Sequence, residues 1–573
     1  MFLCSHYVSK RLTIQYTDHA DELSRTRSTP ASDVTLLSQH NRSRGSTLHK
    51  LSRRLYDSYP ISALRYWLYT PLVASVTIGR ACLMLFYFGA LLFAALYRTN
   101  IFVNPGRASG IAVSQLPFLF ALATKNSVIG LFLSVGYERL SFFHRYMGRL
   151  VVLAANVHAI GFIYKWTQAG TFTQHIQPAE IRWGLVALVS FDILFFFSLS
   201  VFRQKVYQFF YATHFVALIV ALIAIGNHRV EYLPYVIIAA ALYVADRILR
   251  IVRSRISTAH IETIPEIGTT LVRITRPRLN AGWRPGQHVR VRVLSFKLGW
   301  LGWVDVHPYT IASAPLAPYI AAHFSSDPTS PAATPDVNGN DYGELVLMIK
   351  KSGDWTHKLY DIAKTSPSEK SLGGSGTDIK MIVEGPYGNN ACVPLTSFSG
   401  AMIVVGGSGI SFALSAIQDL LQNASPVQSG GMSTIELVWC VRSARAVKPL
   451  IPVFKYLLSQ SNDEALMPLN DTTSEDTQTQ TDEPFFPPGL SLQPGRPKLS
   501  HLLEEVIDRT TARLPDEKAG DSGEGRQKTF SDANGVVLAV CGPGALAEDC
   551  RRAVGSIERW KKEAVGSVEL VEE

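Results

Sequence analysis

The sequence predicts a bundle of six membrane-spanning helices followed by two soluble domains, a small antiparallel β-barrel and an α/β domain. Three observations support this fold class. Apolar stretches crowd into the first half of the chain, and each has about 20 residues, enough to cross a bilayer. From about residue 257 the pattern changes to short alternating strands, as in HVRVRVLSF. From about residue 398, strands alternate with glycine-rich turns and helices, which is typical of a doubly wound sheet.

Length and composition agree with this division. The chain has 573 residues, too many for one compact core, and 47% of them are hydrophobic. Much of the formal net charge of +9 comes from arginines at 42–54 and 247–255, which flank apolar spans. Positive charge in these places orients a membrane protein, so we expect no nucleic-acid binding. The six cysteines form no CxxC pair and no framework spacing, which argues against disulfide staples and structural zinc.

The predicted membrane domain occupies 61–256. Residues 1–60 before it are polar, rich in Ser and Arg, and expected to be disordered. Lys and Arg gather before the first span and after every second span, which places these connections together on the cytosolic side. The six predicted spans lie near 77–97, 113–134, 143–164, 182–202, 208–226 and 231–252.

Four histidines form two pairs with equal spacing in this domain. His144 and His158 are fourteen positions apart at the third span, and His214 and His228 are fourteen positions apart at the fifth. Fourteen positions along an α-helix is about 21 Å of rise, and both side chains then lie within roughly 40° of one face. A single intramembrane histidine is more often a hydrogen-bonded core residue. The haem-ligand interpretation therefore depends on the repeated pair.

Two such helices lying side by side place the four imidazoles in two layers. This is the geometry that holds two b-type haems, each with one axial His from each helix. The third and fifth spans run in the same direction. We therefore predict an inner haem between His144 and His214 and an outer haem between His158 and His228.

The predicted barrel, at 257–397, contains PGQHVRV at 285–291 and HPYTIAS at 307–313. A flavin needs an aromatic or apolar plane against its ring, a donor near the ring nitrogens, and positive or dipolar groups at its phosphates. Tyr309 and Thr310 can supply the first two, and His307 can contribute to the third. Taken alone, HPYT is a strand end that contains a proline, so the flavin interpretation depends on the surrounding motifs.

The predicted α/β domain, at 398–573, contains two glycine motifs. VVGGSGIS follows a buried strand, and its glycines would let backbone N–H groups approach a pyrophosphate at a helix N-terminus. CGPG at 541–544 follows a second apolar strand at 535–540. A lone GGSG can be an ordinary strand–helix turn, and the second motif strengthens the nucleotide interpretation. We expect 461–532, which is rich in Ser, Thr, Asp and Pro, to be a disordered insertion.

The segment WCVRSARAVKP at 439–449 places three basic residues just after a strand. A site that selects NADPH over NADH needs positive charge for the 2′-phosphate. The alternative is a solvated basic loop. We predict NADPH, with Arg442, Arg445 and Lys448 as the candidate contacts.

The chain resembles the fungal ferric/cupric reductase transmembrane family, which is related to the superoxide-producing NADPH oxidases. The resemblance covers about 60–573 apart from the insertions. It implies a ferric reductase-like haem domain, a ferredoxin-reductase-like β-barrel that binds FAD, and an NADPH-binding α/β domain. It is carried by YERLSFFHR (137–145), the two His pairs, HPYTIAS, GDWT (353–356), EGPYG (384–388), VVGGSGIS (404–411) and CGPG, in the family's order.

The resemblance also implies roles for individual residues. Thr310 and Cys541 are the implied catalytic residues, with Cys541 beside the nicotinamide; the alternative for Cys541 is a small buried apolar residue. The residues implied to bind FAD and NADPH are His307, Pro308, Tyr309, Thr310, Ile311, Ala312, Ser313, Gly353, Trp355, Thr356, Gly385, Tyr387, Gly388, Gly406, Gly407, Ser408, Gly409, Ile410, Arg442, Arg445, Cys541, Gly542 and Pro543.

The implied function is a membrane ferric-chelate reductase, with Cu(II) as a further acceptor, that serves iron uptake. Electrons from cytosolic NADPH would pass through FAD and the two haems to the metal outside. A haem accepts one electron at a time, so the flavin must divide the pair that NADPH delivers. Two alternatives stay open: a superoxide-generating NADPH oxidase with the same electron-transfer path, and a non-catalytic haem membrane protein.

The same resemblance gives the expected setting. We expect a multi-pass protein of the plasma membrane, with a vacuolar or other endomembrane location as the alternative. The expected partners are the lipid bilayer, metal chelates outside and NADPH inside, together with an iron-uptake permease or oxidase.

Overall fold

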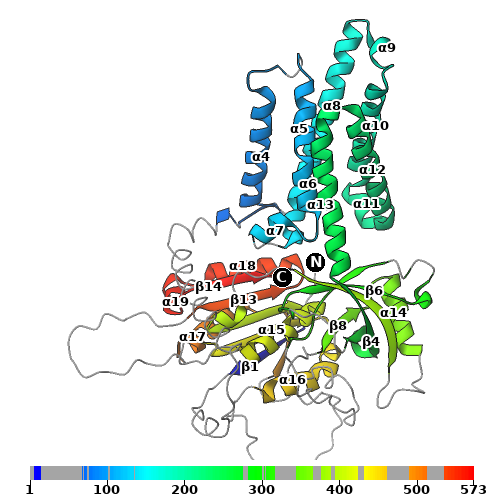
Figure 1. Cartoon of the computed structure of the whole chain (residues 1–573). Helices are drawn as coiled ribbons and strands as arrows, with labels where there is room; N and C mark the ends of the chain where they lie inside the picture. Colours follow the sequence, from blue (N-terminus) through cyan, green and yellow to red (C-terminus); the bar gives the residue numbers. More distant parts are fainter. Residues whose placement is uncertain are drawn as a thin grey trace, which may run out of the picture. The chain divides into compact units, whose positions relative to one another are not determined.

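The computed structural model contains two compact units, 29–252 and a second one made of 1–28 and 253–573. The first is helical, and the second holds two β-sheets with their helices (Figure 1). The structure describes residues 6–13, 67–68, 70–73, 76–100, 103–133, 136–274, 282–299, 302, 305–315, 344–365, 376–388, 394–423, 431–460, 490–512 and 534–573.

Three helices in the described part of the helical unit are long and apolar enough to cross a membrane: α4 (Ile78–Leu96), α8 (Tyr137–Gln168) and α12 (Tyr207–His228). Two more have similar lengths, α10 (Ala179–Phe197) and α13 (Leu233–Val252), but each carries three charged side chains. Six spans therefore stay a prediction. The shorter helices are α5 (Gly106–Ser114), α6 (Leu116–Ala123), α7 (Val128–Leu133), α9 (Phe172–His175) and α11 (Ser200–Lys205).

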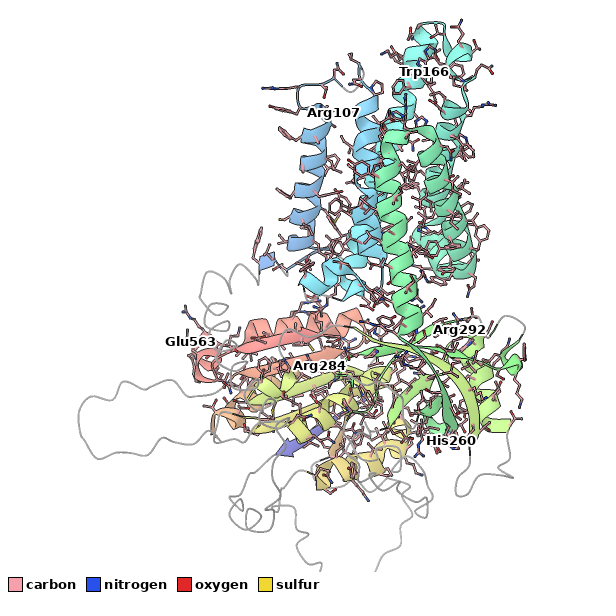
Figure 2. All side chains as sticks on the ribbon, in the orientation of Figure 1. Arg107, Trp166, His260, Arg284, Arg292 and Glu563 are labelled. Carbon is pink, nitrogen blue, oxygen red and sulfur yellow. The ribbon has the colours of Figure 1, made fainter. Side chains whose placement is uncertain are left out.

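The predicted span at 113–134 is wrong as a single helix. Its residues are divided among α5, α6 and α7, with breaks at Gln115 and at 124–127. The first break precedes Pro117, which stands in the first turn of α6 and cannot continue the preceding helix. The helices pack through small residues such as Ala187, Ala224 and Ala239, which let backbones approach closely. Large apolar side chains on the outside of the unit remain exposed, as expected for a lipid-facing surface (Figure 2).

The first sheet of the second unit confirms the predicted antiparallel barrel. Its six strands pair antiparallel in the order β7-β6-β9-β4-β5-β8, and a bridge between Ile311 and Leu347 joins the end of β7 to β8. The barrel is thus nearly closed, and β6 alternates buried valines with partly exposed polar residues. The strands are β4 (Ser254–Ile264), β5 (Thr269–Ile274), β6 (His288–Val293), β7 (His307–Thr310), β8 (Leu345–Lys350) and β9 (Thr377–Tyr387), and α14 (Asp354–Thr365) follows β8.

The second sheet confirms the predicted α/β domain. Four strands run parallel in the order β11-β10-β13-β14, and β1 and β12 extend the sheet beyond β11. Separate apolar cores on the two faces contain α15 and α16 on one side and α17 and α18 on the other. The elements are β1 (His6–Thr13), β10 (Gly400–Gly406), α15 (Ile410–Asn423), β11 (Thr434–Val441), α16 (Ile451–Ser459), β12 (Leu490–Pro494), α17 (Leu499–Ala512), β13 (Val536–Cys541), α18 (Gly544–Ser556), α19 (Arg559–Ala564) and β14 (Val568–Glu572).

Two segments that were predicted to be disordered contain ordered elements. Within 461–532, residues 490–494 form β12 and 499–512 form α17, whose Leu503, Val506 and Ile507 are buried in the core. The helix forms because these apolar residues recur at helical spacing, a pattern that the polar composition of the whole segment obscures. Within 1–60, residues 6–13 form β1, which lies between β11 and β12. The rest of 1–60, and residues 461–489 and 513–532, lie outside the described residues.

Candidate functional site

The two glycine motifs of the α/β domain meet at the carboxyl ends of β10 and β13. A Cβ on Gly409 would lie 2.5 Å from the carbonyl oxygen of Cys541, and one on Gly406 would lie 3.0 Å from Cδ of Pro543. Gly407 has a φ of +56°, which favours glycine. After β10 the chain crosses to β11 on one side and later to β13 on the other. The contact therefore lies at the topological switch point, where such sheets bind ligands.

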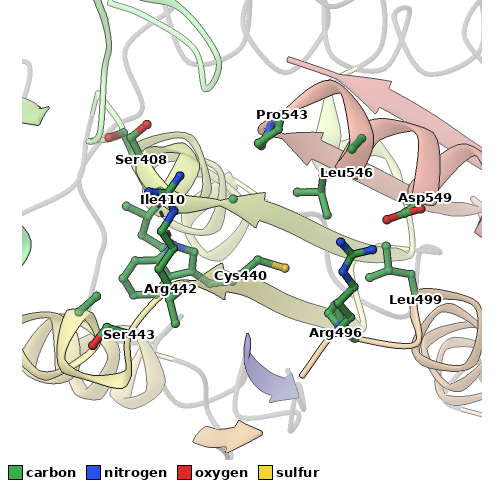
Figure 3. A pocket seen from close by; sticks show the side chains of 18 of the residues that line it. Ser408, Ile410, Cys440, Arg442, Ser443, Arg496, Leu499, Pro543, Leu546 and Asp549 are labelled. Atoms are coloured by element: carbon green, nitrogen blue, oxygen red, sulfur yellow. Dashed lines mark hydrogen bonds between the residues drawn. The ribbon is translucent and has the colours of Figure 1, made fainter. Parts of the chain in front are cut away.

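A cavity of about 960 Å³ opens beside these loops. Arg442 and Ser443, which follow β11, line it together with Arg496, which follows β12. Figure 3 shows the two arginines extending from the ends of their strands, with the Cys440 side chain between them. The cavity has glycine-rich backbone at one end and guanidinium groups along its wall, a combination that suits a phosphorylated dinucleotide.

The cavity separates the predicted basic residues. Arg442 lines it, whereas Arg445 and Lys448 are not among its lining residues. Arg496 was missed because it belongs to the segment that was predicted to be disordered. The signal was present in GRPKL at 495–499, where a glycine and two basic residues stand directly before the apolar periodicity of α17.

Cys541 lies at the end of β13, where its Sγ would be 3.4 Å from a Cβ on Gly409. Burial, with a smaller contribution from the Glu573 carboxylate, raises the pKa of the Cys541 thiol to about 11. The raised pKa favours the neutral thiol over the thiolate, and the place of Cys541 beside the nicotinamide stays a prediction.

Two predicted flavin motifs, HPYT and GDWT, come together on the barrel. The imidazole of His307 lies 4.5 Å from the Trp355 ring, and the Tyr309 ring stacks on Trp355 at 6.3 Å and 23°. Burial lowers the pKa of His307 and raises that of Tyr309, so both side chains are neutral. Nε2 of His307 is buried and has no hydrogen-bond partner among the described residues. An aromatic group with an unsatisfied buried nitrogen fits a ligand that is both planar and polar.

Other residues of these two segments are buried in the core or hydrogen-bonded to the backbone. The side chains of Ile311 and Ala312 are fully buried. The Ser313 hydroxyl donates to the carbonyl of Glu344 and accepts from the Val346 N–H. The Thr356 hydroxyl accepts from the Ser352 and Gly353 N–H groups and so fixes the start of α14. Flavin contacts by these residues stay a prediction.

EGPYG packs against PGQH on the same barrel. A Cβ on Gly388 would lie 3.3 Å from Cα of Gln287, and both Gly385 and Gly388 have positive φ. The Tyr387 hydroxyl donates to the Glu384 carboxylate at 2.9 Å, and the Tyr387 ring lies 6.1 Å from the imidazole of His288. These glycines let the backbones of EGPYG and PGQH approach each other. The contact joins the EGPYG motif to the start of β6.

In the helical unit, Nδ1 of each predicted haem ligand has a hydrogen-bond partner. His144 pairs with the Leu119 carbonyl at 3.0 Å, His158 with the Pro105 carbonyl at 3.0 Å, and His228 with the Glu180 carbonyl at 2.8 Å. A carbonyl only accepts, so these three imidazoles donate from Nδ1 and keep a lone pair on Nε2. His214 shares its Nδ1 bond with the Ser198 hydroxyl at 3.0 Å.

The two histidines of the predicted outer pair lie close to each other. The rings of His158 and His228 have centroids 6.3 Å apart. Metal–imidazole bonds of about 2 Å place the ring centres of two ligands on one ion roughly 6 Å apart. His144 and His214 are close enough to interact electrostatically. The residues present therefore fit bis-imidazole ligation, and ligation itself stays a prediction.

Two glycines make room around the outer pair. A Cβ on Gly184 of α10 would lie 2.7 Å from Cε1 and Nδ1 of His228, and one on Gly161 of α8 would lie 2.8 Å from the Pro105 ring. Gly184 thus lets the His228 imidazole reach the Glu180 carbonyl one turn earlier on α10. Gly161 lets the Pro105 segment approach His158. The sequence pattern pointed to neither glycine.

Comparison with known proteins finds similarity in the helical unit and along much of the chain. Residues 108–225 match the family described as ferric reductase like transmembrane component. The chain is 23% identical over 429 residues to ferric/cupric reductase transmembrane component 2 of Saccharomyces cerevisiae, an alignment that covers 70% of this chain and 55% of the relative. It is 29% identical over 355 residues to a probable metalloreductase of Debaryomyces hansenii, with 60% and 57% covered.

A second probable metalloreductase, from Scheffersomyces stipitis, is 24% identical over 459 residues, which cover 78% of this chain and 77% of that protein. The chain spans little more than half the length of the first two relatives. Residues 108–225 thus match a ferric reductase-like transmembrane component, and the chain as a whole is similar to ferric/cupric reductase transmembrane components and metalloreductases of fungi.

Proposed function

We propose that this protein is a membrane metalloreductase that passes electrons from cytosolic NADPH, through FAD and two b-type haems, to ferric or cupric chelates on the other side. The names of the relatives, as ferric/cupric reductase components and metalloreductases, support this substrate class. We further propose the plasma membrane as its location and iron uptake, with a permease or oxidase partner, as its purpose.

One observation carries the proposal. Four histidines on two membrane helices each have Nδ1 in a hydrogen bond to a backbone carbonyl or a hydroxyl. A metal-bound histidine almost always makes such a bond, because it fixes the ring and leaves Nε2 for the metal. Core histidines that serve only packing have no reason to share this arrangement at one repeated spacing.

Residues of the α/β domain would hold the nucleotide, and residues of the barrel would hold the flavin. The loops at Gly406–Gly409 and Cys541–Pro543, with Arg442 and Arg496, would hold NADPH in the cavity. His307, Tyr309 and Trp355 would hold the isoalloxazine ring or its neighbouring groups on the barrel. When bound, the flavin supplies the conversion of a two-electron hydride into single electrons.

Hydrogen bonds to two acidic side chains support six spans. The Asp192 carboxylate on α10 accepts from the Asn156 amide on α8 at 2.8 Å. Asp246 on α13 is buried and accepts from the backbone and side-chain amides of Asn126 at 2.9 and 3.0 Å. Acidic residues in membrane helices are tolerated when they are paired within the protein. We therefore propose that α10, α13 and the α5–α6 pair complete the spans begun by α4, α8 and α12.

The proposal is tested by recording reduced-minus-oxidised visible spectra of membranes after NADPH is added. We expect low-spin b-type signals, and reduction of Fe(III) chelates that depends on them. The absence of these signals would overturn the proposal. Haem signals that NADPH does not reduce would identify a non-catalytic haem protein, and superoxide in place of reduced metal would identify an oxidase.

The Gly184→Ala substitution is expected to damage the outer haem site selectively. The new methyl group would press on His228 and break its bond to the Glu180 carbonyl. Losing a partner of this kind costs roughly 10–100-fold in metal affinity. Haem content per protein should fall toward half, measured by pyridine haemochrome. Gly110→Ala, whose methyl group has no atom within 4 Å, is the control. Full haem content in Gly184→Ala would contradict the prediction.

Arg442→Ala and Arg496→Ala are each expected to raise the KM for NADPH more than the KM for NADH. A hydrogen bond to a charged group contributes about 1.5–3 kcal/mol, which is roughly 10- to 100-fold in affinity. Steady-state kinetics with both nucleotides measure the ratio. Lys455→Ala, on the exposed side of α16, is the control. An unchanged NADPH/NADH preference in both arginine variants would contradict the assignment.

A further inference from the structure

A continuous column of rings extends from His158 along the outer end of α8, and the haem assignment uses only its first ring. The His158 imidazole contacts Phe162 with centroids 5.0 Å apart, and Phe162 contacts Trp166 at 5.2 Å. Trp166 then stacks on His175 of α9 at 5.0 Å and an interplanar angle of 22°. His158, Phe162 and Trp166 are successive i, i+4 neighbours on one face of the helix. The column therefore links a predicted ligand of the outer haem to a histidine beyond the end of α8.

His175 has the same hydrogen-bond arrangement as three of the predicted haem ligands, but its side chain is more exposed. Its Nδ1 lies 3.0 Å from the carbonyl oxygen of Thr171, so the ring donates from Nδ1 and keeps its lone pair on Nε2. The side chain is exposed to solvent. The bond to Thr171 and the stack on Trp166 together hold the imidazole in place, and Nε2 keeps the lone pair that a metal ion would bind.

Helix length places this end of the column outside the hydrocarbon core. α8 has 32 residues, about 48 Å of helix, whereas the core is about 30 Å thick. Trp166 is eight residues beyond His158, which is about 12 Å along the axis. Figure 2 marks Trp166 at the end of the helical unit where α8 meets α9. His175 thus lies where an external acceptor can reach it.

We propose that His175, supported by Trp166, is the docking ligand for the acceptor metal. Nε2 of His175 would enter the coordination sphere of Fe(III) or Cu(II) held in a weak chelate with an exchangeable position, since imidazole suits both metals. The packed rings fill the space between this metal and the outer imidazole pair, so that electron transfer crosses no water gap. The inference rests on the proposed function.

The step at this site is a transfer of one electron. Fe(III) becomes Fe(II), or Cu(II) becomes Cu(I), and the donor behind His158 loses one electron. No bond within the protein breaks, and no proton is required. Reduction loosens the chelate, because the anionic groups of the chelate hold Fe(II) less strongly than Fe(III).

A purely structural role for the column makes a different prediction. Aromatic pairs at these distances contribute about 0.5–1.5 kcal/mol each, and tryptophan is common at membrane interfaces. In that case replacing the imidazole would change stability but not metal binding. The first test therefore uses metal binding as a readout that does not depend on turnover.

The first experiment titrates the purified, oxidised full-length protein with Cu(II) and records electron paramagnetic resonance without NADPH. We expect one Cu(II) site whose signal shows nitrogen coupling, and we expect its Cu(II) affinity to fall at least tenfold in His175→Gln. Loss of a hydrogen-bond partner of a ligating histidine already changes metal affinity by roughly 10–100-fold, so loss of the ligand itself should change it at least as much. Gln174→Ala, which changes an exposed neighbour on α9, should bind Cu(II) as the unchanged protein does. Equal Cu(II) affinity in His175→Gln would overturn the proposal.

The second experiment measures reduction kinetics in membranes. His175→Gln should raise the KM for Cu(II) and for ferric citrate about tenfold or more, by the same ligand argument, and leave NADPH-driven haem reduction unchanged. Trp166→Leu should lower the turnover number, whereas Trp166→Phe, which keeps an aromatic ring, should retain it. Unchanged kinetics with intact haem reduction would defeat this inference alone. Absence of haem reduction in the unchanged protein would defeat the proposed function instead.

Discussion

His158→Leu is expected to remove the outer haem and to lower metal-chelate reduction by more than about 100-fold, since even outer-shell partners of such ligands are worth 10–100-fold. The leucine cannot ligate iron, and His228, 6.3 Å away, loses the partner across the site. His144 and His214 make their own hydrogen bonds, so the inner site should survive. NADPH should then still reduce the flavin and one haem. A spectrum with half the haem signal and no reduction of external chelates is the expected result.

The control for this experiment is Ile160→Leu, a change on the exposed side of the same helix. It alters a lipid-facing side chain and leaves the Pro105 and His158 contact in place. Two haem signals in His158→Leu would show that this histidine is not a ligand. A complete loss of both signals would instead mean that the two sites depend on each other for folding.

The sequence predicted the fold where periodicity and glycine motifs were both strong. The alternating valines of HVRVRV predicted β6, and all three are fully buried. The pairing of His158 with His228 followed from helix geometry and chain direction alone. These features are local or depend on a regular repeat, so a one-dimensional pattern contains them.

What the sequence could not predict depends on contacts between distant segments. Arg496 reaches the cavity only because β12 joins the sheet through β1, and neither strand has a strong apolar signal. Gly184 is 44 positions from His228, so nothing in the local sequence shows that the two meet. The column at His175 also depends on how α9 turns back onto Trp166.

Average composition conceals local structure in two segments. Residues 461–532 are polar on average, yet Leu503, Val506 and Ile507 sit among them at helical spacing and fill a core. An average over a long window suppresses a short amphipathic helix. The broken span at 113–134 is the opposite case, because its apolar average concealed Pro117.

Gly409→Ala is expected to abolish NADPH-driven flavin reduction, because the space beside Gly409 is already filled by backbone. The added Cβ would lie 2.5 Å from the Cys541 carbonyl oxygen and 3.2 Å from its carbon. A backbone atom cannot rotate away as a side chain can, so the loops after β10 and β13 must separate. Overpacking of this kind costs about 1–3 kcal/mol, and the separation would also pull the phosphate-binding N–H groups apart.

The test is stopped-flow reduction of the flavin by NADPH, with dithionite as a second reductant. Dithionite bypasses the nucleotide site, so it should still reduce the haems in Gly409→Ala if the rest of the protein is intact. Gly544→Ala is the matched control, since it adds the same methyl group three residues beyond Cys541 and meets no atom within 4 Å. Normal NADPH-driven rates in Gly409→Ala would show that the nucleotide does not depend on this contact. A Cβ on Gly409 would meet Cys541, whereas one on Gly544 meets no atom within 4 Å. A loss confined to Gly409→Ala would therefore attribute the requirement to the space between the two loops and not to the glycine content of the motifs.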